Sequence, residues 1–203
     1  MGVYIDQNLS WYDHIGVTCS KVAKGVGIIG RMKYILPVNV LRMLYNTLVL
    51  PHISYCSVIW SGAYASYLQK LIVLQNRAIR HITRASSRDH ITKHYRSLNL
   101  LKLQDHLKLN DTIFVFNWIN DKLPKSFASF FIRNTLVHNY NTRRANDLHK
   151  QSYTTTSSAR SLRNRAISLW NSLPDGIKSQ NSLTSFKRSL HNHFINVYAT
   201  DQS

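Results

Sequence analysis

The chain has 203 residues, enough for one domain or two small ones around a buried core. Hydrophobic residues make up 44% and aromatic residues 11%, which excludes a disordered basic tail. Lys and Arg number 26 against nine acidic residues, all of them Asp, so the formal net charge is +17. A folded protein this basic is typical of nucleic-acid binding first and of an acidic membrane surface second. A merely well-solvated basic surface is the alternative.

Targeting and cysteine signals are weak. The N-terminus has no charged segment followed by an apolar run, and no stretch of about 18 apolar residues occurs anywhere in the chain. We therefore expect an intracellular protein of the nucleus or cytoplasm, without a membrane partner. Cys19 and Cys56 lack CxxC spacing and are predicted to stay reduced. His52 and Cys56 have the spacing of two metal ligands, but no second close pair completes a tetrahedral site, so core packing is favoured.

In chain order, the patterns predict a mainly α-helical protein, a multi-helix bundle. A short β-branched and aromatic run over 3–6 predicts a remnant N-terminal strand. Apolar residues at helical spacing then predict helices over 14–32 and 40–50, the second capped by Asn39. Pro51 then kinks or restarts the helix, and residues 52–60 continue as an apolar segment.

The stretch 68–84 has the clearest two-sided pattern. At about 100° per residue, one face is apolar, with Leu68, Leu71, Ile72, Ala78, Ile79 and Ile82. The opposite face is basic and contains no acidic residue, with Lys70, Arg77, Arg80, His81 and Arg84. The cations continue beyond this helix through Arg88, Lys93 and Arg96. We predict that one face joins the core and that the other meets an anion.

The C-terminal half changes character after a strongly apolar helix predicted over 105–120. Residues 133–158 are rich in Asn, Thr, Ser and Arg and predict a loop with a candidate β-hairpin near 140–156. Ser157 or Ser158 is expected to cap a helix through Trp170, and Ser182 to cap the last helix. A second cationic cluster is expected here, with Arg160, Arg163 and Arg165 pointing outward. Binding and plain solvation remain equal alternatives for this cluster, which comprises Arg143, Arg144, Arg160, Arg163 and Arg165.

Catalytic patterns are not recognisable. Metal-dependent phosphoryl transfer needs closely spaced carboxylates, whereas the nine Asp are scattered. No phosphate-binding glycine motif, nucleophile elbow or HExxH motif is present, so no catalytic residue, metal site or cofactor is predicted. Arg suits phosphate because its planar fork donates to two oxygens, and such contacts give affinity without base specificity. The expected partner is therefore the RNA or DNA backbone, bound independently of sequence. A solvated helix face normally interleaves Glu with Lys, and this chain has no Glu.

Five segments together carry a family resemblance. The chain resembles the C-terminal region of the reverse transcriptases of jockey-type, LINE-like non-LTR retrotransposons. Each segment alone is mostly apolar helix, but their order and spacing over nearly the whole chain make the set specific. The segments are GVYIDQNLSWYDHI (2–15), YNTLVLPHISYCSVIW (45–60), LQKLIVLQNRAIRHIT (68–83), HNYNTRRA (138–145) and LWNSLPDGIKSQNSLTSFKRSL (169–190).

The resemblance implies three regions: the end of the palm over 1–14, a thumb-like helical domain over 15–125 and a C-terminal extension over 126–203. In this family of RNA-directed DNA polymerases, the tandem aspartates and the divalent metal belong to an upstream palm. We expect this chain to lack that palm, the fingers, an endonuclease and a CCHC knuckle. The resemblance thus implies a nucleic-acid-binding fragment that grips template–primer duplex or element RNA without a catalytic centre of its own.

Three alternatives remain. An active reverse transcriptase conflicts with the missing carboxylates. A helical protein-interaction module would use exposed apolar faces to bind a partner, for example the missing palm and fingers supplied in trans. A retroelement remnant without any function is the third.

Overall fold

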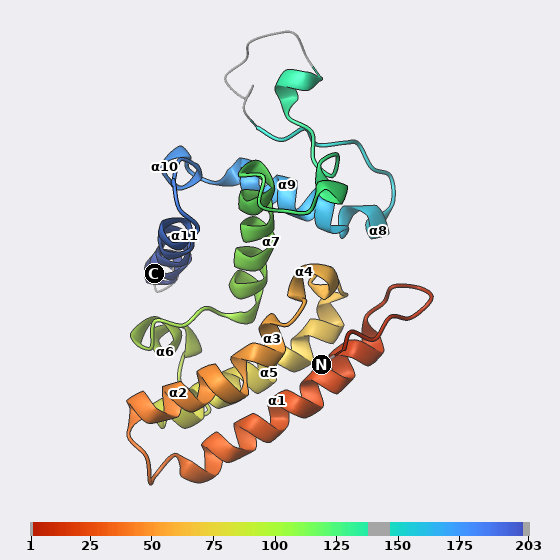
Figure 1. Cartoon of the computed structure of the whole chain (residues 1–203). Coiled ribbons are helices and arrows are strands. Elements are labelled where there is room, and N and C mark those ends of the chain that lie inside the picture. Colours follow the sequence, from red (N-terminus) through yellow and green to blue (C-terminus); the bar gives the residue numbers. More distant parts are fainter. Residues whose placement is uncertain (1, 138–146, 201–203) are drawn as a thin grey trace. The chain divides into compact units, whose positions relative to one another are not determined.

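The computed structural model describes residues 2–137 and 147–200, and the regular structure in these ranges is helical (Figure 1). This confirms the mainly helical fold predicted from the sequence. The chain divides into two compact units: unit 1 comprises Met1–His106 and His193–Ser203, and unit 2 comprises Leu107–Asn192. The helices α7 (Leu103–Ile119) and α11 (Leu183–Thr200) contribute residues to both units.

Unit 1 is built around two parallel helices that lie side by side, α1 and α5. The Tyr12 ring at the start of α1 meets Tyr67 near the start of α5, with ring centroids 5.1 Å apart. At the other ends, Arg84 Nε donates to Lys33 O at 2.9 Å. The other described helices of this unit before α7 are shorter. The full set, with bounds, is α1 (Tyr12–Met32), α2 (Val38–Leu48), α3 (Leu50–Ser54), α4 (Ser57–Trp60), α5 (Ala65–Thr83) and α6 (Ile91–Ser97).

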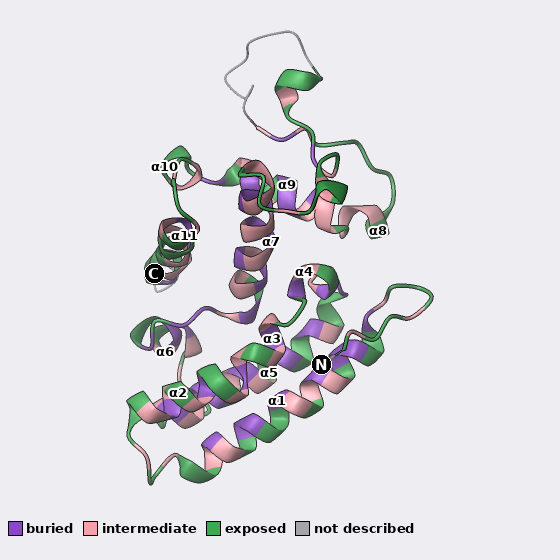
Figure 2. Ribbon diagram, viewed as in Figure 1, coloured by how far each residue is buried: buried purple, intermediate pink, exposed green. Residues whose placement is uncertain are grey.

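The core of unit 1 lies between the inward faces of α1, α2 and α5, where buried residues recur at helical spacing (Figure 2). Fully burying an aliphatic side chain of this kind stabilises a fold by roughly 1.5–3 kcal/mol. Gly25 lets α1 approach the end of α2 closely, because a Cβ atom there would lie 2.8 Å from Leu48 O. The central buried side chains are Ile15, Val22, Ile29, Leu41, Tyr45, Trp60, Leu71 and Ile79.

The N-terminal strand prediction is wrong for the described residues. No strand forms over 3–6, because Asp6 organises a turn instead. The carboxylate of Asp6 accepts hydrogen bonds from the backbone N–H groups of Ser10 and Trp11, at 3.0 and 2.9 Å. These bonds, led by that from Ser10, hold the pKa of the Asp6 carboxyl below its usual value. The chain therefore enters α1 through a local polar cap.

Two helix boundaries also differ from the predictions. Helix α2 begins at Val38 with Pro37 in the N-cap position, so Asn39 lies inside the helix and does not cap it. The apolar segment 52–60 is not continuous, since Cys56 adopts a left-handed backbone with φ 50° and separates α3 from α4. A proline sits in the first turn of α3, as expected from the restart at Pro51.

Unit 2 has an aromatic core around α7. The ring of Phe116 stacks on Phe186 of α11, with centroids 4.3 Å apart and an interplanar angle of 21°. Ser182 caps α11 as predicted, because its Oγ accepts the Ser185 N–H at 3.1 Å. The remaining helical elements of this unit are short except for α9. They are η1 (Lys125–Phe127), η2 (Asn134–Leu136), α8 (Thr156–Ala159), α9 (Leu162–Ser172) and α10 (Asp175–Lys178).

The expected helix up to Trp170 forms as two pieces, and neither starts where the serine pattern suggested. Thr155 caps α8 by accepting the Ser158 N–H, and Ser161 caps α9 by accepting the Asn164 N–H. The hairpin predicted near 140–156 falls partly on 138–146, which lie outside the described residues. Among the described ones, a single bridge joins Arg133 to Leu148, and residues 150–154 have no regular structure.

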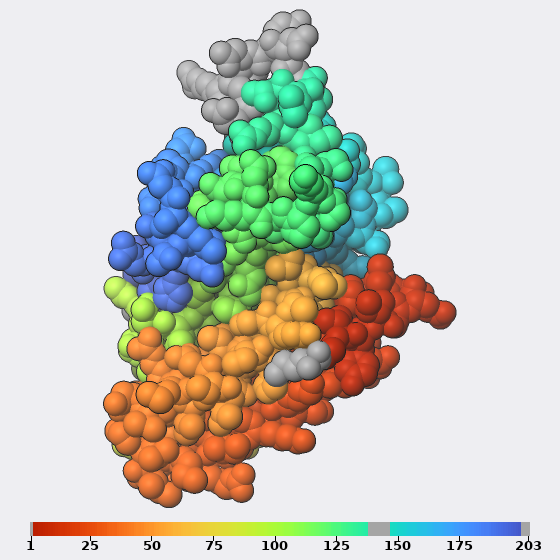
Figure 3. All heavy atoms as spheres, viewed as in Figure 1, coloured from red at the N-terminus to blue at the C-terminus, as the bar shows by residue number. Residues whose placement is uncertain are grey.

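Apolar side chains are exposed at the turn between α1 and α2. In the space-filling view this turn and α2 form much of the visible surface of unit 1, in orange (Figure 3). Tyr34 and Ile35 are 76% and 74% exposed. Within the described ranges, no helix combines the length and the apolarity needed to cross a bilayer.

Candidate nucleic-acid interface

Helix α5 has the two faces predicted for residues 68–84. Leu68, Leu71, Ala78, Ile79 and Ile82 are all buried, whereas Ile72 is only half-buried. The inward face therefore joins the core of unit 1 as expected. This face also contains one buried polar residue that the sequence pattern did not predict.

That residue is Gln75, which is 1% exposed. Its Nε2 donates to Tyr45 Oη at 2.8 Å and to Leu101 O at 3.0 Å, and its Oε1 accepts the Leu103 N–H at 2.7 Å. Gln75 thus links α5 to α2 and to the start of α7, and both its amide nitrogen and its amide oxygen are hydrogen-bonded. Burial raises the pKa of Tyr45 to about 12, so its hydroxyl stays protonated.

The outward face of α5 presents its cations in a row. Lys70 and Arg77 are exposed, and neither forms an ion pair within the described chain. The ammonium of Lys70 lies 5.4 Å from the Tyr12 ring centroid. Arg80 is half-buried and its Nε donates to Ser86 O at 3.3 Å. That bond uses one of the five N–H groups of the guanidinium and orients the rest.

The two remaining basic residues of α5 have structural roles. Arg84 has a left-handed backbone, φ 55°, at the end of the helix, and its guanidinium donates to the carbonyls of Lys33 and Leu36. It therefore fastens the α1–α2 turn. The His81 ring lies against Gly30, since a Cβ there would come within 3.0 Å of its Nε2. Burial, followed by the charges of Lys33 and Arg77, lowers the pKa of His81.

Beyond α5 the cations continue as predicted, since Arg88, Lys93 and Arg96 are exposed. One of them, Lys93, affects the pKa of His94. Burial and the charge of Lys93 lower its pKa, Asp89 raises it, and Arg80 lowers it further. Burial is the largest cause at both His94 and His81, and the nearby cations add to it by disfavouring a further positive charge. A surface with this potential attracts anions.

Three of the four acidic residues that the structure describes in unit 1 accept hydrogen bonds within that unit. Asp6 caps the entry to α1, and Asp89 accepts the Ser86 N–H at 2.9 Å. Asp105 accepts the Tyr198 hydroxyl at 2.7 Å. These three carboxylates therefore have hydrogen-bond partners other than the cations on the outward face of α5. The fourth, Asp13, lines a pocket together with Lys70.

The second predicted cluster does not gather into one patch in the described structure. Arg143 and Arg144 lie outside the described residues. Arg160 Nε donates to Thr156 O at 3.4 Å, and the Arg163 guanidinium lies 5.1 Å from the Phe130 ring centroid. These contacts hold Arg160 and Arg163 against their own unit.

Arg165 was expected to point outward, and that orientation is wrong. Its Nε lies 3.1 Å from Asp111 Oδ2, and the two side chains are 18% and 3% exposed. Arg165 Nη1 also donates to Arg160 O. The pair joins α9 to α7 inside unit 2, so the charge of Arg165 is used within the fold.

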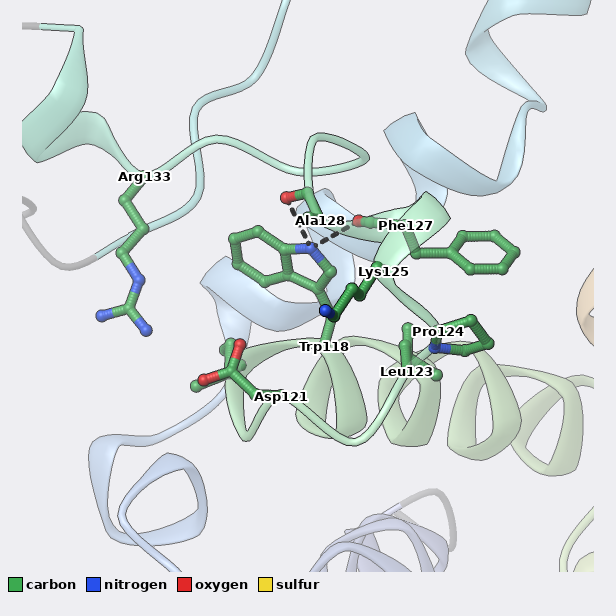
Figure 4. Close-up of a pocket in the computed structure, with 9 residues that line it drawn as sticks. Trp118, Asp121, Leu123, Pro124, Lys125, Phe127, Ala128 and Arg133 are labelled. Carbon is green, nitrogen blue, oxygen red and sulfur yellow. Dashed lines mark hydrogen bonds between the residues drawn. The ribbon is translucent and has the colours of Figure 1, made fainter.

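A pocket on unit 2, which the sequence analysis did not find, has a volume of about 410 Å³ (Figure 4). Its central side chain is Trp118, whose Nε1–H donates to Phe127 O at 2.9 Å and to Ala128 O at 3.3 Å. Arg133 and Asp121 lie on one side of the indole, and Phe127 lies on the other. The lining combines aromatic side chains with charged ones, and this combination suits an aromatic ligand that carries polar groups.

Among the described residues, no group of three or more His, Cys, Asp or Glu side chains is placed to hold a metal ion. The core packing favoured above for His52 and Cys56 is wrong for Cys56, which is a free and exposed thiol, and His52 is only half-buried. Comparisons with family models, curated proteins and solved structures found no match. The resemblance to retrotransposon reverse transcriptases therefore stays a prediction.

Proposed function

We propose that this chain binds the sugar-phosphate backbone of RNA or DNA without base specificity, through Lys70, Arg77 and Arg80 of α5 and through Arg88. The observation that carries the proposal is a row of cations on one helix face without acidic neighbours on that helix and without ion pairs in the described chain. Nearby cations, which add to burial in lowering the pKa of His81 and of His94, support it.

The dimensions of the row suit a nucleic-acid strand. Lys70 and Arg77 are seven residues apart, which corresponds to about 10 Å along a helix. The row through Arg80 extends this to about 15 Å, or roughly four phosphates of one strand at about 3.4 Å each. Arg84 and Arg165 are left out of the proposed interface because their guanidinium groups have structural partners.

In the setting implied by the family resemblance, the bound nucleic acid is a template–primer duplex or element RNA. The chain then supplies grip, and the chemistry belongs to a palm with its metal-binding aspartates. We expect the purified chain to give no product in a primer-extension assay. Extension above background would contradict this reading.

Salt dependence tests the proposal directly. Each phosphate contact contributes about −0.9 to the slope of log K against log salt. The triple substitution of Lys70, Arg77 and Arg88 to Gln should therefore reduce the slope by about 2 to 3, measured by fluorescence anisotropy with a labelled RNA–DNA duplex. Circular dichroism should be unchanged, because these side chains are exposed.

A matched control removes the same charge elsewhere. Lys24, Lys187 and Arg188 are also exposed, and their change to Gln should alter the slope by less than one third as much. Equal loss in both triple variants would mean that net charge alone drives binding. Binding whose affinity is flat between low and physiological salt would rule out an electrostatic grip altogether.

The helical protein-interaction module remains a second candidate, because the α1–α2 turn exposes Tyr34 and Ile35 and α2 exposes Met43 to 63%. A contiguous exposed apolar surface is typical of protein interfaces. If these side chains drive association, Tyr34→Ser together with Ile35→Ser should convert an oligomer to a monomer in size-exclusion chromatography. An unchanged elution volume would count against this second candidate.

A further inference from the structure

The Trp118 pocket has features that the cationic row on α5 does not explain. Trp118 stands in the last turn of α7, and its only polar group, the indole N–H, already donates to two backbone carbonyls. The ring also meets Phe131 edge-on, with centroids 5.4 Å apart. Because its donor is satisfied and its position is held, Trp118 offers the pocket a fixed aromatic wall.

Three charged side chains surround this wall: Asp121, Lys125 and Arg133 all line the pocket, and all three are exposed. None of them forms an ion pair with the protein in the described chain. Arg133 also projects from a fixed backbone, since it bridges to Leu148 and the following N–H, that of Asn134, donates to Asp147 O at 3.0 Å. The pocket thus presents two cations and one carboxylate around a planar ring (Figure 4).

We infer that this pocket binds a single unstacked nucleotide, with the base against the Trp118 indole and the phosphate on Arg133 and Lys125. Aromatic walls accept any base, because every base has a π face. The Asp121 carboxylate only accepts hydrogen bonds, so it favours a base with an exocyclic amino group. The volume of about 410 Å³ lies in the usual range for small-ligand pockets, about 300–1,000 Å³.

A nucleotide fits this combination better than other small ligands do. A purely apolar ligand would cover three charged groups without pairing them, which is unfavourable. An inorganic anion would use the cations but not the indole. The inference rests on the proposed nucleic-acid binding and extends it: unit 2 would take an unpaired base of the strand, while the α5 row takes the backbone of a duplex.

The indole N–H signals of Trp118 provide the readout. The chain has four tryptophans, so a ¹⁵N-labelled sample gives four indole cross-peaks, and Trp118→Phe assigns the relevant one. Titration with adenosine monophosphate (AMP) should shift the Trp118 peak and leave the peaks of the buried Trp11, Trp60 and Trp170 in place. Uridine monophosphate (UMP), whose base lacks an amino group, should bind more weakly.

Two rim variants separate the assigned contacts without touching the indole. Arg133→Gln should weaken AMP about tenfold and leave adenosine unchanged, because only the phosphate loses its partner. Asp121→Asn should reduce the preference for AMP over UMP. Lys187→Gln, an exposed lysine of α11 that does not line the pocket, is the charge control and should change neither ligand.

Several outcomes would overturn the inference. The Trp118 peak could stay in place at millimolar AMP, or Arg133→Gln could weaken AMP and adenosine equally. Binding of an acidic, Tyr-containing peptide in place of AMP would assign the pocket to a protein partner. A mononucleotide is too short to span the α5 row, so the Gln triple variant of Lys70, Arg77 and Arg88 should bind AMP normally. Failure of the pocket and failure of the α5 grip are therefore distinguishable.

Discussion

Within each unit, a buried polar contact joins neighbouring helices, and the kind of contact differs between the two units. Unit 1 uses a neutral amide: Gln75 makes three hydrogen bonds to α2 and to the segment entering α7. Unit 2 uses an ion pair, Asp111 with Arg165, between α7 and α9. A neutral contact consumes no charge, so it leaves Lys70 and Arg77 without an ion pair in the described part of the chain. In unit 2 an arginine that looked available in the sequence is already neutralised.

The largest expected effect is the loss of one partner of the ion pair. Asp111→Leu leaves the charge of Arg165, 18% exposed, without its carboxylate and should lower the free energy of unfolding by about 3–5 kcal/mol. Urea denaturation measures this change. The double variant Asp111→Leu with Arg165→Met should recover much of the loss, because a buried ion pair is often replaceable by apolar side chains. If the double variant recovers no stability, the packing of the two side chains, and not their charge, accounts for the stabilisation.

The neutral contact of unit 1 should cost less to break. Gln75→Leu keeps the volume but leaves the Leu103 N–H, Leu101 C=O and Tyr45 hydroxyl without the amide. We expect a loss of about 2–3 kcal/mol in unfolding free energy, since each unsatisfied buried group costs about 1–3 kcal/mol and some of these groups rearrange. A nearly neutral substitution would show that water replaces the amide.

Two glycines of α1 test how closely this helix packs in unit 1. Their substitution by Ala should change the stability in opposite directions. A Cβ atom on Gly27 meets nothing within 4 Å, so Gly27→Ala should raise the thermal midpoint through a gain of about 1 kcal/mol in helix propensity. Gly25→Ala is the matched control. Its Cβ would come 2.8 Å from Leu48 O, so this variant should be destabilised. Stabilisation by both would mean that α1 and α2 are less tightly packed.

The smallest expected effect is acid sensitivity of unit 1. Burial lowers the pKa of His14 and His81 below 6.5. The unfolded chain then binds more protons than the folded one below that pH, so stability is complete above about pH 6.5 and falls on acidification. Nε2 of His14 has no partner in the described part of the chain to stabilise an added proton. Urea midpoints at pH 7.5 and 5.5 should differ less for His81→Asn than for the parent chain.

Much of the fold was predictable because apolar periodicity specifies which helix faces become buried. The faces of α1, α5 and α11 follow this rule. Helix α7 does not, because Asp111 is buried there while Ile113 and Ile119 are only half-buried. The two polar contacts were not predicted because their partners lie far away in sequence, such as Arg165 and Asp111, 54 positions apart. Gln75 did carry a signal, since it shares the angular position of Leu68 and Ile79 on the wheel. Because Gln is neither apolar nor charged, its residue type did not assign it to the apolar face or to the basic face.

The candidate site was predictable only in part. Exposed Lys70, Arg77 and Arg88 follow directly from the basic pattern. The structural role of Arg84 depends on the carbonyls of a turn about fifty residues earlier in the chain, and no local pattern reports that. The Trp118 pocket depends on the path of the chain from Asp121 to Arg133, which lacks the periodicity that makes helices readable.

One contact in unit 1 has a consequence for the order of folding during synthesis. Tyr198 of α11 is 3% exposed, donates to Asp105 and accepts the Lys102 N–H at 2.9 Å. A ribosome must therefore add all of residues 107–192 before this part of unit 1 can close. Closure across such a separation is entropically slow. During that interval the nascent N-terminal helices would expose apolar side chains to which chaperones can bind. The end of α11 would pack against this unit last.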